Sequence, residues 1–211
     1  MFDADLNGKV ISPSRMAHVV LRTAQFKPMI EFYKAVLGAH VVMETSAMAF
    51  LTYDDEHHRI AIIAIPGCGA TVPNTAGLEH IAFTYDTLED LLTAYLQRKA
   101  RGILPIWSVN HGPTMSLYYQ DPDRNKIETQ VDIFDTPEEA TKILTSPELQ
   151  DNPFGVDFDP DDLIRRLKNG EPEAELMKLV HIGTRGFDSV PLVNTPAPFV
   201  KDSYEPIDTA A

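Results

Sequence analysis

The stretch RMAHVVLRTAQFKPMIEFYKAVLGAHVVME, residues 15–44, decides the fold. It reads as a strand, then a helix whose apolar residues recur at the helical period, then a second strand. The apolar helix positions are Met29, Ile30, Tyr33, Val36 and Leu37. Gly38 follows them and is a favourable residue for ending a helix. Two further strand-like runs come next, AMAFLTY (47–53) and RIAIIAI (59–65).

A second stretch, GLEHIAFTYDTLEDLLTAYLQRKARGI at residues 77–103, repeats this order. A strand near 78–84 leads to a helix that is capped by Asp86 or Thr87 and ends near Gly102. Further strands are predicted near residues 104–109, 114–119 and 126–132. Each half therefore reads β-α-β-β-β, and the sequence predicts an α+β fold built from two paired modules.

The chain divides into three parts by composition. Residues 1–13 form an N-terminal extension, residues 14–132 hold the two modules (14–66 and 77–132), and residues 133–211 form a tail. The Gly- and Pro-rich run PGCGATVPNTAG links the modules. The tail is predicted to be partly helical, in TPEEATKILTSPEL and in DPDDLIRRLKNGE. Its last thirty or so residues are Pro-rich, and we expect them to wrap around the body or a partner subunit.

Charge and cysteine content narrow the classes of function. Lys and Arg number 18 and Asp and Glu number 31, so the formal charge is −13. This balance argues against a nucleic-acid binder or a protein of anionic membranes, since both need basic patches. Cys68 is the one cysteine, and we interpret it as a turn residue without a chemical role. The absence of a disulfide pair, of a membrane-spanning run and of a signal peptide predicts a cytoplasmic protein.

Two histidines and one glutamate occupy matching places on the repeat. His18 and His80 are placed in the first strand of each half, and Glu128 in the last strand of the second half. Two imidazoles and one carboxylate form the ligand set that holds non-heme Fe(II), and this set leaves further coordination positions of the metal open. Taken singly, a strand histidine is more often hydrogen-bonded or exposed, and a strand glutamate is more often solvated. Their symmetric placement is what favours a metal site.

The run HGPTMSLYYQDPDRNKIE (111–128) gives these positions a family context. With the paired modules, it resembles the vicinal oxygen chelate superfamily, and within it the type I extradiol ring-cleavage dioxygenases. The matching signature residues are His111, Leu117, Tyr118, Asp121, Pro122 and Glu128. That family usually has Gly or Pro where this chain has Arg124, and we expect Asn125 to take the left-handed conformation of the turn.

A second motif, DDEHHRIAI (54–62), resembles the His-His segment of the same family. In that family the second histidine acts in proton transfer, which assigns this role to His58. Strand alternation predicts that His58, Ile60 and Ile62 point to one side, with Ile62 in the place that Glu128 takes in the second half. The first half then offers no fourth ligand, whereas glyoxalase-like members do.

The resemblance implies a curved sheet around a site where Fe(II), or Mn(II) in its place, is held by His18, His80 and Glu128. The substrates would be dioxygen and a catechol, for example a bulky 2,3-dihydroxybiphenyl-like one, with His111 and Tyr118 hydrogen-bonded to it. Candidate apolar pocket residues are Met48, Phe50, Trp107 and Met115. Two alternatives stay open: a glyoxalase-like lyase, isomerase or epimerase, and a metal-free module that binds aromatic compounds. We expect a homodimer or a larger homo-oligomer.

Overall fold

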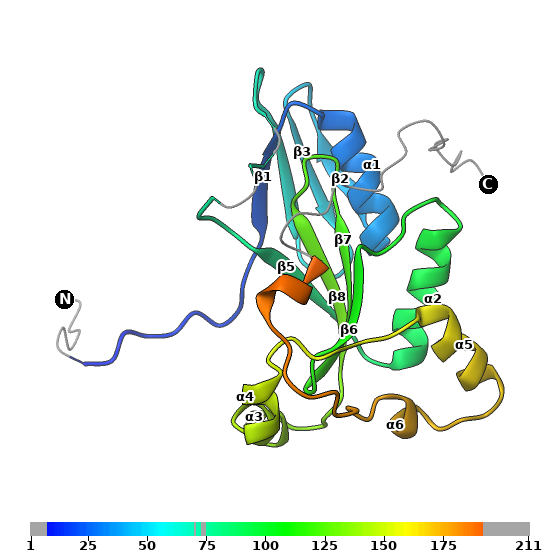
Figure 1. Ribbon diagram of the computed structural model, residues 1–211. Helices are drawn as coiled ribbons and strands as arrows, with labels where there is room; N and C mark the ends of the chain where they lie inside the picture. The colour runs from blue at the N-terminus through cyan, green and yellow to red at the C-terminus, as the bar shows by residue number, and fades with distance from the viewer. Residues whose placement is uncertain (1–7, 70, 73–74, 192–211) are drawn as a thin grey trace.

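The computed structural model describes residues 8–69, 71–72 and 75–191 and contains both predicted modules (Figure 1). The first consists of β1 (Val19–Thr23), α1 (Phe26–Leu37), β2 (His40–Glu44), β3 (Met48–Thr52) and β4 (Ile60–Ala64). The second consists of β5 (His80–Tyr85), α2 (Leu88–Lys99), β6 (Trp107–Asn110), β7 (Thr114–Gln120) and β8 (Lys126–Asp132). The prediction of an α+β protein with repeated β-α-β-β-β units is confirmed.

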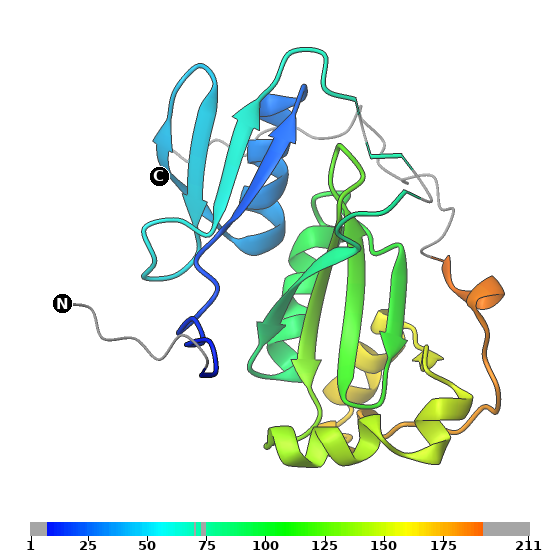
Figure 2. The same cartoon turned by 90° about the vertical axis from the view of Figure 1, so that its left-hand side faces the viewer.

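The two sheets share one topology. The first has the strand order β1-β4-β3-β2, and the second has β5-β8-β7-β6 with the short strand β9 added at its edge. In each sheet the first and last strands of the module pair in parallel, and the remaining pairs are antiparallel. The two sheets lie as separate layers, each with its own helix behind it (Figure 2). His18 lies directly before β1 rather than inside it.

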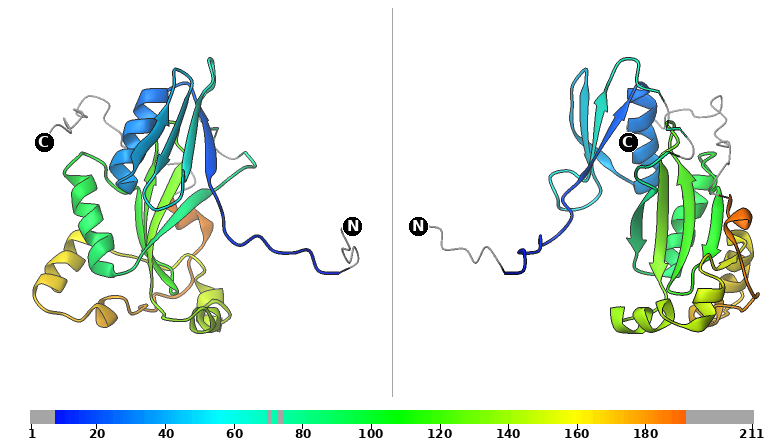
Figure 3. Two further views of the ribbon diagram at one scale, coloured as in Figure 1. Left: turned by 180° about the vertical axis from the view of Figure 1, so that it is seen from behind. Right: turned by 60° about the vertical axis from the view of Figure 1, so that its left-hand side comes forward.

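The sequence indicated the end of α1 at Gly38 and the start of α2 at Asp86 or Thr87, and the structure agrees, but α2 ends at Lys99 rather than near Gly102. Gly38 closes α1 with φ 63°, a left-handed conformation that glycine adopts without steric cost. The side chain of Thr87 accepts a hydrogen bond from the Asp90 amide and caps α2. Both helices lie on the same side of the sheets (Figure 3), and one cluster of buried apolar side chains runs from α1 to α2.

Arg98 ties the two modules together inside this core. The residue is 1% exposed. Its Nε and Nη2 donate to the carbonyl oxygen of Val36 at 2.9 and 2.7 Å, in the last turn of α1. Further donated bonds reach Tyr85 and Thr129 in the second sheet. A buried cation is thus placed at the negative end of the α1 dipole, with its donors satisfied by oxygen atoms from both modules.

The turn between β7 and β8 forms a second link between the modules. Buried Asp121 accepts hydrogen bonds from the backbone and side chain of Asn125, and from the Tyr33 hydroxyl of α1 at 3.1 Å. Within the described residues, Arg124 is the one residue other than glycine with positive φ, at 69°. The expectation that Asn125 takes the left-handed conformation is therefore wrong by one position. Asn125 instead supplies the hydrogen bonds that hold the turn.

The tail surrounds one edge and the base of the second module (Figures 1 and 2). It contains α3 (Pro137–Leu144), α4 (Pro147–Asp151), β9 (Val156–Asp157), α5 (Pro160–Lys168), α6 (Glu173–Leu176) and a 3-10 turn, η1 (Phe187–Ser189). The predicted helices are present, and the Asp159 side chain caps α5 by accepting a hydrogen bond from the Asp161 amide. Strand β9, which pairs with β6, was not predicted. Of the predicted wrapping segment, residues 192–211 lie outside the described residues, as do residues 1–7 of the N-terminal extension.

Two smaller observations concern the described part of the chain. No helix in it combines the length and the apolar character needed to cross a lipid bilayer. Cys68 lies in the connection between β4 and β5, with a free and partly exposed thiol.

Candidate active site

A row of four side chains crosses the second sheet on the face that α2 does not cover. The strand register pairs Ala82 with Glu128, Glu128 with Tyr118, and Tyr118 with Trp107. Paired residues on neighbouring strands point to the same side of a sheet, and alternate residues point to opposite sides. The residues between them, such as Leu117 and Ile127, belong to the apolar core. Glu128 is thus a carboxylate on the open face, although it is itself only 5% exposed.

Glu128 is held by three hydrogen-bond donors. His80 Nε2 lies 2.9 Å from its Oε2, and the Tyr118 hydroxyl donates to its Oε1 at 2.8 Å. Burial raises the pKa of Glu128, but hydrogen bonds from His80, Ser116 and Tyr118 outweigh burial and lower that pKa. The carboxyl group therefore stays ionised at neutral pH in spite of its burial.

His80 lies between two carboxylates. Its Nε2 faces Glu128, and its Nδ1 bonds to Glu79, the preceding residue. The hydrogen bonds that His80 donates, first to Glu128 and then to Glu79, raise the pKa of His80 to about 9. A histidine whose second ring nitrogen is fixed by a carboxylate is the usual arrangement around a metal-binding imidazole. Glu79 is a site residue that the sequence analysis missed, although its position directly before His80 could have indicated it.

Tyr118 joins Glu128 to His111. The Nε2 atom of His111 lies 2.9 Å from the Tyr118 hydroxyl oxygen. Because a carboxylate can only accept, the phenol proton points to Glu128, and the phenol oxygen faces the imidazole. Burial raises the pKa of Tyr118, and the charge of Glu128 raises it further. Burial also lowers the pKa of His111, against the opposing effects of Glu128 and of a hydrogen bond to the Phe154 carbonyl.

The first module carries a second group of histidines. The rings of His18 and His58 lie 4.3 Å apart between centroids. His58 also stacks on Phe50 of β3, at 4.4 Å and an interplanar angle of 12°, and its Nδ1 lies 2.6 Å from Nδ1 of His57. Burial, followed by the charges of His18 and His57, lowers the pKa of His58. At neutral pH this imidazole is uncharged, so it is able to accept a proton.

The predicted strand parity around His58 is wrong. Ile62 is paired with Leu21 and Ala49 and is fully buried in the core. His58 instead contacts Phe50, whose partner on β4 is Ala61. Because His58 precedes β4, the alternation of that strand does not extend to it. Matching the parallel pairs of the two modules sets Ala61, rather than Ile62, in the place of Glu128. Alanine offers no metal ligand either, so the absence of a fourth ligand in the first module still follows.

The six predicted site residues thus fall into two groups. His80, Glu128, Tyr118 and His111 form one connected group in the second module, and His18 and His58 form the other in the first. Among the described residues, no cluster of three or more His, Cys, Asp or Glu side chains is close enough to hold a metal ion. The donor types of His80 and Glu128 suit Fe(II) or Mn(II), and His80 Nε2 lies 2.9 Å from Glu128 Oε2.

The predicted pocket residues also separate. Trp107 stacks on Tyr118 at 5.2 Å, and Phe50 and Met48 lie on the uncovered face of the first sheet. Met115 is 1% exposed and belongs to the core on the opposite face of β7, so it cannot line the site. Ser116, one position further along β7, takes the site face and donates to Glu128.

Comparisons with known proteins give the family of this chain. Residues 15–129 match the model of the Glyoxalase/Bleomycin resistance protein/Dioxygenase superfamily. The chain is 47% identical over 159 residues to a protein named biphenyl-2,3-diol 1,2-dioxygenase 2, from Rhodococcus globerulus, which covers 75% of this chain and 84% of that protein. It is 49% identical over 164 residues to biphenyl-2,3-diol 1,2-dioxygenase 3 of the same organism, covering 77% and 86% respectively. Among solved structures, a lactoylglutathione lyase from Agrobacterium tumefaciens matches 56% of this chain and 94% of its own, with 17% identity and a TM-score of 0.47.

Proposed function

Because this chain belongs to the Glyoxalase/Bleomycin resistance protein/Dioxygenase superfamily, we propose that it is an extradiol dioxygenase that opens the ring of a bulky catechol. The observation that carries the proposal is the continuous series His111–Tyr118–Glu128–His80 on one face of the second sheet. It offers an anionic and an imidazole ligand next to an aimed phenol donor. The names of the two Rhodococcus relatives support biphenyl-2,3-diol as the first substrate to test.

We further propose that His18, His80 and Glu128 together hold Fe(II). His80 and Glu128 already face each other, and His18 lies with His58 in the first module, so a bound ion would bridge the two modules. When bound, an iron ion with this ligand set supplies the redox chemistry through which a catechol reacts with dioxygen. Mn(II) accepts the same nitrogen and oxygen ligands and is the alternative metal.

The other polar residues then have separate tasks. His58 is uncharged at neutral pH and would accept a proton from a catechol hydroxyl. Tyr118, whose proton points to Glu128 here, would turn that proton toward a bound substrate oxygen, and His111 would orient the phenol through the 2.9 Å contact. The burial of both residues excludes water that would otherwise compete for these bonds. A cytoplasmic location and a homo-oligomeric state complete the proposal.

The test is an oxygen-uptake assay on protein loaded with Fe(II) in the absence of air. Catechol, 3-methylcatechol and biphenyl-2,3-diol are added in turn, and oxygen consumption is followed with the yellow colour of a ring-opened product. We expect uptake with the two-ring catechol at the lowest substrate concentration. An iron-loaded protein that consumes no oxygen with any catechol would favour a glyoxalase-like lyase, isomerase or epimerase. A protein that binds aromatic compounds but never binds metal would favour the metal-free module.

The ligand assignment is tested by metal content. His18→Ala, His80→Ala and Glu128→Ala should each lose iron while remaining folded, and Gln130→Ala serves as the control. Gln130 lies on the same strand and face as Glu128, two residues further along, but bonds only to Thr84 and Asp132. Full iron content in any one of the three variants would remove that residue from the metal site.

A further inference from the structure

Trp107 is the one tryptophan of the chain, and it lies against both residues that are to handle the substrate. Its indole stacks on Tyr118 with centroids 5.2 Å apart and meets the His111 ring edge-on at 5.4 Å. The residue is 6% exposed. A rotation of the indole would therefore displace the phenol, the imidazole or both.

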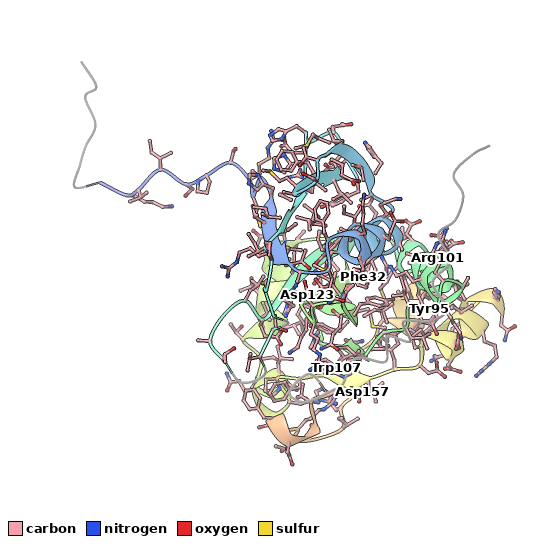
Figure 4. The ribbon with its side chains drawn as sticks, turned by 90° about the horizontal axis from the view of Figure 1, so that it is seen from above. Phe32, Tyr95, Arg101, Trp107, Asp123 and Asp157 are labelled. Carbon is pink, nitrogen blue, oxygen red and sulfur yellow. The ribbon has the colours of Figure 1, made fainter. Side chains whose placement is uncertain are left out.

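The tail fixes the orientation of this indole. Asp157 of β9 accepts a hydrogen bond from Trp107 Nε1 at 2.7 Å, and Figure 4 shows the two labelled side chains next to each other. The Arg185 guanidinium lies 5.6 Å from the centroid of the Trp107 ring, within the range of a cation–π contact. Two residues from the tail thus hold one side chain of the second module.

Asp157 is itself held by Arg185. Nη1 and Nη2 of Arg185 reach the two carboxylate oxygens of Asp157 at 2.7 and 3.0 Å. The remaining donors reach the Gly155 carbonyl and both the carbonyl and the hydroxyl of Ser189. All five N–H groups of the guanidinium are therefore used, and its side chain is only 8% exposed. A guanidinium with all its donors bonded is held in one orientation. The Asp157 carboxylate that it binds, which accepts the hydrogen bond from Trp107, is therefore fixed as well.

The chain geometry is adapted to this contact. Gly155 has φ 81°, and a Cβ atom there would lie 2.0 Å from the Asn110 carbonyl oxygen. This close approach lets β9 pair with β6 and brings Asp157 alongside Val109, two residues from Trp107. The neighbouring Phe154 carbonyl accepts a hydrogen bond from His111. The same short segment therefore contacts both Trp107 and His111.

We propose that Asp157, held by Arg185, is a positioning residue that fixes Trp107 and, through it, the Tyr118 hydroxyl and the His111 imidazole. This inference rests on the proposed dioxygenase function for its effect on turnover. It gives the tail a task that the two modules alone do not perform. In the described part of the chain Asp157 bonds to Trp107 and Arg185 rather than to the proposed metal ligands, so losing its contact should act on the rate of the reaction and leave metal binding intact.

The first experiment compares Asp157→Ala with Asp157→Asn in full-length, Fe(II)-loaded protein. Asp157→Ala should keep its iron and lose kcat by about 10- to 100-fold, the size of effect expected when reacting groups are misplaced by a fraction of an ångström to about 1 Å. Asp157→Asn keeps an acceptor oxygen for the indole and should stay within about threefold of wild type. Asp161→Ala is the control, because it removes another tail carboxylate, bonded to Lys99 of α2 away from the site.

A double-variant cycle separates positioning from a general effect on stability. The Trp107→Phe variant lacks the indole N–H, so adding Asp157→Ala to it should lower kcat little further. If the two substitutions acted independently, their fold-reductions in kcat would multiply. Trp107→Phe alone should lower kcat as much as Asp157→Ala does. If kcat of Asp157→Ala equals that of the wild type, or if the two effects multiply fully, the proposal is overturned. If Asp157→Ala does not fold, Trp107→Phe decides alone, and a wild-type kcat in it overturns the proposal.

Fluorescence gives a readout that does not depend on the reaction. Because Trp107 is the one tryptophan, Asp157→Ala should shift its emission maximum and raise its quenching by acrylamide, while Asp161→Ala should change neither. An unchanged spectrum in Asp157→Ala refutes the positioning of Trp107 even in an inactive protein. Conversely, the emission of Trp107 could shift in Asp157→Ala while the wild-type protein takes up no oxygen. That result would support the contact between Asp157 and Trp107 and refute the proposed dioxygenase function instead.

Discussion

Replacing Tyr118 by Phe tests the proposed chemistry at a single atom. The substitution keeps the aromatic ring. This ring stacks on Trp107 at 5.2 Å between centroids and meets the His80 ring edge-on at 5.4 Å. The substitution deletes only the hydroxyl, which donates to Glu128 at 2.8 Å and contacts His111 at 2.9 Å. Packing is thus almost unchanged, and any effect on activity comes from the lost hydrogen bonds.

The expected size follows from the nature of these bonds. A hydrogen bond to a charged group contributes about 1.5–3 kcal/mol, and a donor aimed at developing charge in a dry site about 2.7–4 kcal/mol. Because about 1.4 kcal/mol corresponds to a tenfold change in rate, we predict a fall in kcat/KM of about 10- to 1000-fold. Iron content should stay normal, and the melting temperature should change by only a few degrees, about 2–4 °C per kcal/mol lost for a chain of this length.

The assay is steady-state oxygen uptake with biphenyl-2,3-diol, with iron measured on the same sample. Tyr119→Phe is the matched control. Tyr119 is the next residue on β7, points to the opposite face, and receives only a long 3.5 Å bond from Arg98; it should retain wild-type kcat/KM. If Tyr118→Phe also retains wild-type kcat/KM, the phenol is a packing residue and its assigned role is refuted. If it loses iron instead, the phenol serves Glu128 rather than the substrate.

Three further predictions concern proton transfer and stability. His58→Phe should keep iron and bind catechol but lower kcat by about 10²–10⁴-fold. A near-normal kcat at saturating substrate would show that His58 has no role in proton transfer and that the His57–His58 pair is only a surface turn. Arg98→Met should lower the free energy of unfolding by about 3 kcal/mol in urea titrations, because it leaves buried oxygens such as the Val36 carbonyl without a donor; an unchanged midpoint would contradict this. Burial raises the pKa of Asp121 to about 6, so its contribution to stability is present below about pH 4 and is lost as the pH rises through about 6. The stability of wild type relative to Asp121→Asn should therefore fall over that interval, and a pH-independent difference would show that Asp121 titrates normally.

The sequence predicted the repeat because each module carries its own signals. Apolar periodicity in α1, Gly38 at its end and the Thr87 cap before α2 are local features, and local features are visible in one chain. Two of the predicted ligands, His80 and Glu128, lie on β5 and β8, which pair, and the structure brings their side chains within 2.9 Å of each other. Their partners Glu79 and Ser116 were missed because each is an ordinary polar residue until the register is known.

Two errors have a common physical origin. The left-handed turn residue was assigned to Asn125, whereas Arg124 takes that conformation. The first-module equivalent of Glu128 was assigned to Ile62, whereas the strand pairing gives Ala61. Each assignment was wrong by one position. A shift of one residue moves a strand side chain to the other face, and sequence alone does not fix register at strand ends. Strand β9 was missed because two residues carry no periodicity; its pairing with β6 depends on the close approach at Gly155.

The most direct test of the central claim is the fate of labelled dioxygen. Iron-loaded protein is given biphenyl-2,3-diol under isotopically labelled dioxygen, and the product is analysed at once by mass spectrometry. The proposed function predicts a ring-opened product, cleaved beside the two hydroxyl-bearing carbons rather than between them, that carries both atoms of one dioxygen molecule. Recovery of an intact or unlabelled aromatic ring from protein with full iron content would contradict it.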